Sequence, residues 1–218
     1  MDAKIQIEKE KTWNDIREKA VFIEDKIHAH LKEEKPELFK SFDGGSTELE
    51  YLDLLHYLVK AVKPNLVLET GSFKGFGSLA IAFSLRENGL GKLVTIDIEK
   101  HRIAELEEKI RLYNLADFIE THCIDSIEYC NITSRQYDIV FFDSDIAVRP
   151  YEFRKLHKKK AIKNLAIFHD TSIYRSKTLY NPHENNGDYL AFLRKLQAEF
   201  GGINFPLSRG LQVFQISD

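Results

Sequence analysis

Three aspartates of this sequence stand where an apolar run ends, a position from which a side chain can contact a ligand. Asp97 and Asp143 each close such a run, and Asp170 directly follows another. A carboxylate there can accept hydrogen bonds from sugar hydroxyls, take up a proton or bind a divalent ion. His169 precedes Asp170, and its imidazole could accept a proton from a substrate hydroxyl, or it could only close a structural hydrogen bond.

A glycine-rich turn follows the apolar residues Val67 and Leu68, in the segment Glu69-Thr-Gly-Ser-Phe-Lys-Gly-Phe-Gly-Ser78. Gly71 and Gly75 lack a Cβ, so the backbone can turn tightly and approach a ligand closely. The helix expected next offers unpaired N–H groups, and Asp97 can accept hydrogen bonds from both hydroxyls of a ribose. These features indicate a cofactor that contains adenosine, although the glycines could be plain turn residues and Asp97 a helix cap.

Strand and helix patterns alternate from residue 65 onward. Strands are predicted at Asn65–Glu69, Lys92–Asp97, Phe118–His122, Tyr137–Asp143, Asn164–His169 and Leu211–Ile216. Helices are predicted at Ser78–Arg86, around Ile103–Ile110 and around Leu190–Leu196. Such alternation predicts an α/β fold with a mostly parallel sheet and helices on both faces. Ligands of these sheets bind beyond the carboxyl ends of the strands, so the residues after each strand are the candidates.

The first 45 residues differ from the rest. One apolar helix face is predicted before Pro36, from Trp13, Ile16, Ala20, Ile23, Ile27 and Leu31. A capping box at Thr47 and Glu50 predicts the start of a second helix, whose buried side is expected to hold Tyr51, Leu54, Leu55, Leu58 and Val62. We therefore expect a helical extension over residues 1–45, which covers the cofactor end or mediates a homodimer, and one α/β domain over residues 46–218.

The composition is that of an ordinary soluble chain: 218 residues, 43% hydrophobic, with a formal net charge of −3. That charge gives no electrostatic reason to expect a nucleic-acid partner. No apolar stretch is long enough to span a membrane, and no signal-peptide core follows the start. The two cysteines, Cys123 and Cys130, suggest neither a disulfide framework nor a metal site. We expect a cytoplasmic protein that acts on a small molecule.

A different enzyme class shares part of this pattern. The loop Thr70–Gly77 also resembles that of short-chain NAD(P) oxidoreductases, and Tyr151 with Lys155 gives a Tyr-x-x-x-Lys pair. Against this alternative, Glu69 would bring a carboxylate close to the pyrophosphate of a dinucleotide, and like charges repel. The tyrosine also follows the loop too early in the chain for that family.

Residues 65–170 resemble class I S-adenosylmethionine-dependent methyltransferases, nearest to the catechol and caffeoyl-CoA type and to sugar O-methyltransferases. Four segments in order carry the resemblance: the glycine loop, Thr95–Glu99, His122–Ser126 and Tyr137–Asp145. The resemblance implies a Rossmann-like sheet of seven strands with an antiparallel last strand. It also implies S-adenosylmethionine as the cofactor, with Glu69 suited to the methionine ammonium. The implied cofactor-binding residues are Glu69, Gly71, Ser72, Phe73, Gly75, Ser78, Asp97, Ile98, Asp125 and Ser126.

The same resemblance implies O-methylation of a small molecule, such as a catechol-like or sugar hydroxyl. In metal-dependent members, Mg²⁺ lies between acids after the fourth and fifth strands, here Asp143 and Asp170, with Thr171 where Asn or Asp is usual. Ile146 stands near the place of the catechol-type lysine. Asp145 completes an Asp-x-Asp pattern whose second acid can act as general base, so the catalytic candidates are Asp143, Asp145 and His169. A methyltransferase-like binding module without activity is the remaining alternative, which these acids disfavour.

Overall fold

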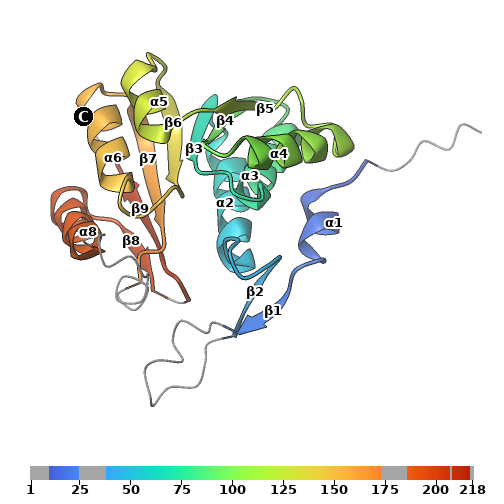
Figure 1. Cartoon of the computed structure of the whole chain (residues 1–218), viewed down its shortest axis with the longest axis horizontal. Coiled ribbons are helices and arrows are strands. Elements are labelled where there is room, and N and C mark those ends of the chain that lie inside the picture. Colours follow the sequence, from blue (N-terminus) through green and yellow to red (C-terminus); the bar gives the residue numbers. More distant parts are fainter. Residues whose placement is uncertain (1–9, 25–37, 173–185, 207, 217–218) are drawn as a thin grey trace, which may run out of the picture.

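The computed structural model describes residues 10–24, 38–172, 186–206 and 208–216, and is built around one seven-stranded sheet (Figure 1). The strands lie in the order β5-β4-β3-β6-β7-β9-β8. Their bounds are β3 Leu66–Thr70, β4 Lys92–Asp97, β5 Ile119–Cys123, β6 Tyr137–Phe142, β7 Ile162–His169, β8 Ile203–Phe205 and β9 Leu211–Gln215. The predicted fold class, with seven strands, is confirmed.

Strand directions also agree with the prediction. β3 pairs in parallel with β4 and β6, β4 with β5, and β6 with β7. β9 runs antiparallel to both of its neighbours, β7 and β8. The chain builds the sheet outward in one direction from β3 to β5 and in the other from β6 onward. The strand order therefore switches between β3 and β6, and a ligand is expected at the carboxyl ends of those strands.

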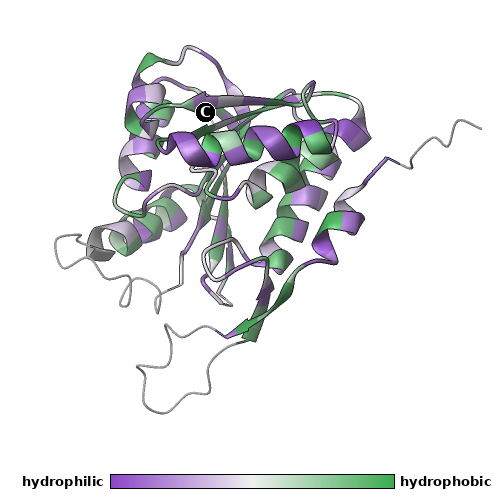
Figure 2. Cartoon of the chain, turned by 45° about the vertical axis from the view of Figure 1, so that its right-hand side comes forward, coloured by the Kyte–Doolittle hydropathy of each residue, from purple (hydrophilic) through white to green (hydrophobic). Residues whose placement is uncertain are grey.

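Helices cover both faces of the sheet, as Figure 1 shows. One face packs against α1 Trp13–Arg17, α2 Leu49–Val62, α3 Phe76–Asn88 and α4 Lys100–Leu112. The other face packs against α5 Ser126–Ile132, α6 Arg149–Lys158 and α8 Asn186–Phe200. In Figure 2 the central strands are mainly hydrophobic while the helices carry both colours. This is the pattern of a parallel sheet buried on both sides by amphipathic helices.

The long N-terminal helix predicted from Trp13 onward is wrong. α1 ends at Arg17, and the next residues form β1 Val21–Glu24, which pairs antiparallel with β2 Leu38–Ser41. Ile23 therefore lies in a strand, although its spacing from Trp13, Ile16 and Ala20 is typical of a helix. Pairing with β2, which is distant in the sequence, decides the structure of this segment. The predicted positions Ile27 and Leu31 lie outside the described residues.

α1 packs on the body of the same chain. The Trp13 side chain is 1% exposed, its indole N–H donates to Asp53 Oδ1 at 2.8 Å, and its ring stacks on His56 of α2. Ile16 is equally buried in the core that includes α2 and α3. These contacts bury the apolar face of α1 within one chain. That face therefore gives no reason to expect the predicted homodimer.

α2 differs from its prediction at the first turn. The helix begins at Leu49 after Glu48, and the Glu48 side chain accepts no capping hydrogen bond from the first turn of this helix. Thr47 instead donates its hydroxyl to Asp143 Oδ2 at 2.9 Å, so the predicted capping box is wrong. The most buried apolar side chains of α2 are Leu52, Leu55 and Val59, whereas Val62 is 38% exposed. No helix within the described residues is both long and apolar enough to cross a membrane.

Candidate functional site

A cavity of about 500 Å³ opens at the carboxyl ends of the parallel strands, around the switch point. This volume lies in the usual range of small-ligand sites, about 300–1,000 Å³. Ten of the residues predicted from the sequence line it: Gly71, Phe73, Asp97, Ile98, Asp125, Ser126, Asp143, Asp145, His169 and Asp170. The fold thus brings most of both predicted groups, cofactor-binding and catalytic, to one cavity.

The turn after β3 passes very close to the end of β6. Gly71 has φ +84°, and a Cβ built on it would lie 2.6 Å from the backbone oxygen of Asp143. Only glycine fits this conformation and this approach. The Gly71 N–H donates to Ile96 O at 2.8 Å and the Asp143 N–H donates to Thr70 O at 2.9 Å, which fixes the turn between β4 and β6.

Asp97 holds the same turn from the other side. One carboxylate oxygen accepts hydrogen bonds from the Phe73 N–H at 2.9 Å and the Ser72 hydroxyl at 3.3 Å. The other accepts from the Glu99 N–H at 2.9 Å. A carboxylate offers about four lone-pair positions, so Asp97 retains capacity to bind a further hydroxyl at the cavity wall. Arg102 lies 5.0 Å from the centre of the Phe73 ring, over its face.

Glu69 lies beneath the turn and not on the cavity wall. It is 1% exposed, and its carboxylate accepts from the hydroxyls of Ser78 and Thr95, the latter at 2.6 Å. A Cβ on Gly77 would overlap with the other carboxylate oxygen. Burial raises the pKa of Glu69 to about 8, against the lowering effect of the two hydroxyls. In this arrangement Glu69 shapes the turn from below.

Three other predicted cofactor residues also lie off the cavity wall. Ser72 donates to Asp97, Gly75 is the N-cap residue of α3, and Ser78 donates to Glu69. They support the turn that the cavity-lining residues belong to. Asp125 both lines the cavity and caps α5, since its Oδ1 accepts from the Glu128 N–H at 2.9 Å.

The acidic end of the cavity is built around Asp143. Its Oδ2 accepts from the Thr47 hydroxyl at 2.9 Å, and its Oδ1 lies 2.9 Å from His169 Nδ1. Asp170 Oδ2 lies 3.6 Å from the same ring nitrogen. Asp143, His169 and Asp170 come from the ends of β6 and β7, which are neighbours in the sheet, and Thr47 comes from the segment before α2.

His169 is held by carboxylates on both sides of its ring. Nε2 lies 2.7 Å from Glu48 Oε2, and Nδ1 lies 2.9 Å from Asp143 Oδ1. Burial alone would lower the pKa of His169, but Asp170, Asp143 and Glu48 outweigh it and raise that pKa to about 9. Both ring nitrogens are then N–H donors at neutral pH. The geometry therefore does not favour the predicted role of His169 as general base.

Asp145 has a different environment at the rim of the same cavity. It is exposed, and its Oδ1 accepts one hydrogen bond, from the Ala147 N–H at 2.8 Å. In the part of the chain that the structure describes, Asp145 forms no ion pair, unlike Asp143 and Asp170. A carboxylate in this state can accept a proton from a bound hydroxyl.

The acidic end does not fit the predicted Mg²⁺ site. Asp143, His169 and Asp170 bring ligand-type atoms within 4.8 Å of one another. However, Arg149 Nη2 lies between the two acids, 3.3 Å from Asp143 Oδ1 and 3.1 Å from Asp170 Oδ2. A guanidinium in contact with both carboxylates occupies the place where they would bind an ion.

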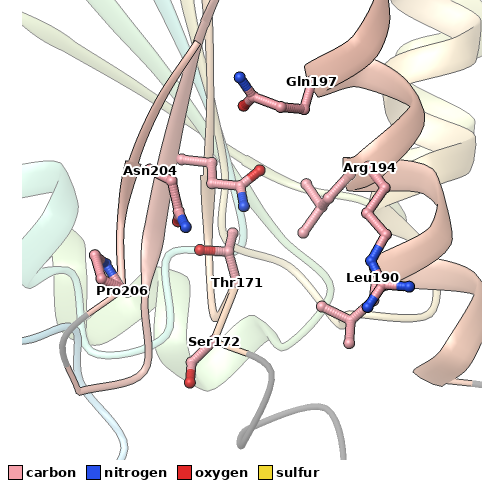
Figure 3. Close-up of a pocket in the computed structure, with 9 residues that line it drawn as sticks. Thr171, Ser172, Leu190, Arg194, Gln197, Asn204 and Pro206 are labelled. Atoms are coloured by element: carbon pink, nitrogen blue, oxygen red, sulfur yellow. The ribbon is translucent and has the colours of Figure 1, made fainter. Parts of the chain in front are cut away.

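Thr171, the third predicted metal ligand, faces away from this cavity. It lines a second cavity of about 440 Å³ beside α8, with Asn204 on one side and Leu190 and Arg194 on the other (Figure 3). Its backbone N–H donates to Gly210 O at 3.2 Å. This placement does not favour Thr171 as a ligand beside Asp143 and Asp170, and its metal role stays a prediction.

Four residues of the acidic end were missed by sequence reasoning: Thr47, Glu48, Arg149 and Arg209. Thr47 was assigned to a helix cap. Glu48 is 1% exposed, and its Oε1 accepts from the Arg209 N–H at 2.8 Å and Nε–H at 3.2 Å. Arg149 follows Asp143 by six residues, just inside α6, and that short spacing was the one local signal available. Glu48 and Arg209 are far apart in the chain and gave none.

The oxidoreductase alternative finds no support at the cavity. Tyr151 is 55% exposed on α6, where Arg154 lies over its ring, and Lys155 is also exposed. Neither side chain is among the residues that line the cavity.

Comparison with known proteins finds similarity to methyltransferases. Residues 68–171 match a family model described as a methyltransferase domain. Among curated proteins, the chain is 24% identical over 151 residues to tapetum-specific methyltransferase 1 of Arabidopsis thaliana, covering 68% of this chain and 64% of the relative. It is 30% identical over 96 residues to a caffeoyl-CoA O-methyltransferase of Stellaria longipes, covering 42% and 40%. The chain thus spans less than two thirds of the length of either relative.

Solved structures share the fold. A methyltransferase of Podospora anserina with bound S-adenosylhomocysteine superposes with a TM-score of 0.68 at 15% identity, covering 100% of both chains. The O-methyltransferase of Streptomyces achromogenes involved in tomaymycin synthesis, in complex with S-adenosylmethionine, gives 0.67 at 16% identity, covering 98% of this chain and 93% of that one. At these identities the likeness concerns the fold.

Proposed function

We propose that this chain, whose residues 68–171 match a methyltransferase domain model, binds S-adenosylmethionine and methylates a hydroxyl of a small molecule. One observation carries the proposal: a single cavity extends from Asp97, after β4, past the Gly71 turn to Asp143 and Asp145, after β6. One cavity thus holds Asp97, an acid suited to ribose hydroxyls, and Asp145, an acid suited to accept a proton, which supports the proposal.

The cofactor end is proposed from the chemistry of the cavity wall. The Asp97 carboxylate would accept the two ribose hydroxyls. Ile98, Asp125 and Ser126 would surround the adenine, with Ile98 giving an apolar contact. The methionine part would then lie along the Gly71 turn, where the missing Cβ leaves the backbone accessible. Glu69 would act from below, by holding the turn through Ser78 and not by direct contact.

The reaction end is proposed for Asp145. S-adenosylmethionine supplies an electrophilic methyl group on a sulfonium. When bound, it would give this methyl group to a substrate oxygen as the bond from carbon to sulfur breaks, with S-adenosylhomocysteine as the neutral leaving group. The hydroxyl proton goes to the Asp145 carboxylate. Asp143 would position the site, because Thr47, His169 and Arg149 already engage its carboxylate.

Cofactor binding is the first test. S-adenosylhomocysteine should raise the melting temperature of the full chain, because a ligand that binds only the native state stabilises it, whereas NADH and NADPH should not. A shift with a nicotinamide cofactor and none with S-adenosylhomocysteine would reverse the choice between the two enzyme classes. The homodimer and the cytoplasmic location stay predictions that these measurements do not address.

Turnover is the second test. The chain is incubated with S-adenosylmethionine and a panel of phenols and sugars, and products heavier by one methylene are sought by mass spectrometry. Asp145→Asn should lower kcat by about 100-fold or more while S-adenosylhomocysteine still binds, as expected for loss of a general base. Asp117→Asn, the same chemical change at an exposed position away from the cavity, is the matched control and should keep kcat. Unchanged turnover in Asp145→Asn would remove Asp145 from the mechanism.

A further inference from the structure

Six ionisable side chains form a closed cluster at the acidic end of the cavity. Three are carboxylates and three are cationic: Glu48, Asp143, Asp170, Arg149, His169 and Arg209. Glu48 contacts His169 and Arg209, and Asp143 contacts His169 and Arg149. Apart from Asp143, which is partly exposed, each member is buried. Two buried guanidinium groups and the His169 ring therefore lie among the three carboxylates.

Arg149 is the centre of this cluster. Its Nη2 contacts Asp143 Oδ1 and Asp170 Oδ2, its Nε–H donates to Ser144 O at 2.8 Å, and its Nη1 donates to His169 O. The side chain is only 3% exposed. A planar guanidinium held by carbonyl and carboxylate oxygens on several sides is fixed in place, unlike a surface arginine. It also keeps its charge at any pH at which the protein is folded.

A divalent ion would have to enter against this arrangement. It would bring two more positive charges to within a few ångströms of the buried Arg149 guanidinium, which already contacts both acids. It would also need the Nδ1 lone pair of His169, which now lies 2.9 Å from Asp143 Oδ1 as a hydrogen-bond partner. Thr171 offers no compensating ligand, because it lines the other cavity.

We infer that Arg149 takes the place of the divalent ion between Asp143 and Asp170, so that this site binds no metal and methyl transfer proceeds without one. Arg149 is a positioning residue: it contacts both acids and fixes Asp143 beside the substrate end of the cavity. This inference rests on the proposed function for its catalytic part only. The part that concerns metal binding can be tested whether or not methyl transfer is found.

The test is a Mn²⁺ titration of the full chain, followed by electron paramagnetic resonance and calorimetry. The native protein should show no saturable Mn²⁺ binding, and Mg²⁺ should leave its melting temperature unchanged. Arg149→Gln opens the space between the two acids, so it should melt at a lower temperature and gain one Mn²⁺ site that stabilises it. Arg154→Gln, on the exposed side of the same helix, is the matched control and should behave as the native protein does.

A further variant keeps the test informative if Arg149→Gln does not fold. Arg149→Lys retains the charge without the planar fork, so it should stay free of Mn²⁺ and keep more of the native melting temperature than Arg149→Gln. Saturable Mn²⁺ binding by the native protein, lost in Asp170→Asn, would overturn the inference. So would a folded Arg149→Gln that gains no Mn²⁺ site. Turnover, where it is found, should be equal in EDTA and in Mg²⁺, and a loss in EDTA that Mg²⁺ restores would also overturn it.

Discussion

Replacement of Asp97 by Asn tests the cofactor end of the site with little change of shape. The carboxylate accepts from the Phe73 and Glu99 N–H groups, both at 2.9 Å, and we propose that it also accepts two ribose hydroxyls. Hydrogen bonds to a charged acceptor contribute about 1.5–3 kcal/mol and those to a neutral one about 0.5–1.5 kcal/mol. The loss is thus about 1–1.5 kcal/mol for each hydroxyl.

For two hydroxyls, Asp97→Asn should weaken S-adenosylhomocysteine binding by about 2–3 kcal/mol, or roughly 30- to 150-fold in Kd. Isothermal titration calorimetry measures this directly, and circular dichroism checks that the variant stays folded. Asp117→Asn makes the same chemical change on the exposed loop before β5, away from the cavity, and should leave Kd unchanged. A folded Asp97→Asn with the native Kd would show that Asp97 serves the turn alone and would refute the assignment.

Two further predictions concern the turn after β3. Gly71→Ala should destabilise the protein more than Gly89→Ala in thermal unfolding. Both glycines have positive φ, but the new Cβ meets a backbone atom only at Gly71, where it would lie 2.6 Å from Asp143 O. Left-handed strain costs about 1–2 kcal/mol, so Gly89→Ala should lose about that much and Gly71→Ala clearly more, and equal losses would contradict the close approach. For Glu69, the folded pKa of about 8 exceeds the unfolded 4.5, so the folded state binds the proton more tightly. Its stabilising contribution is complete below the unfolded pKa and is lost as pH rises through about 8. Urea unfolding should therefore show the native chain losing stability relative to Glu69→Gln across that window, and a constant difference would mean that Glu69 is ionised throughout.

The residues predicted correctly are those with local signals. Lys92–Asp97 has the same bounds in the structure as in the prediction. Its apolar residues Leu93, Val94 and Ile96 are fully buried, and the strand ends in a polar side chain. The position of Asp97 at the cavity follows from that run and from the general rule for parallel sheets. The same reasoning placed Asp143 and Asp170 together.

The parts that could not be predicted depend on partners distant in the sequence. Val21–Glu24 is a strand because it pairs with Leu38–Ser41. The apolar spacing around Ile23 gives no information about this pairing. Likewise, the charge of the acidic end depends on Arg149. Its short spacing from Asp143 could have suggested a contact, but only the fold places it between two acids. The sequence alone therefore showed two carboxylates without a cation, and a bound metal was the natural hypothesis.

The contacts between Glu48 and Arg209 also bear on how the protein folds. The two residues are separated by 161 positions, and Thr47 is separated from Asp143 by 96. Closing such long loops is entropically costly and comes late, after the local helices and neighbouring strands have formed. On a ribosome, Glu48 is synthesised long before Arg209, the residue just before the last strand. Its carboxylate must remain hydrated until then, so a nascent chain can hold a nearly complete sheet while the acidic end of its cavity is still open to water.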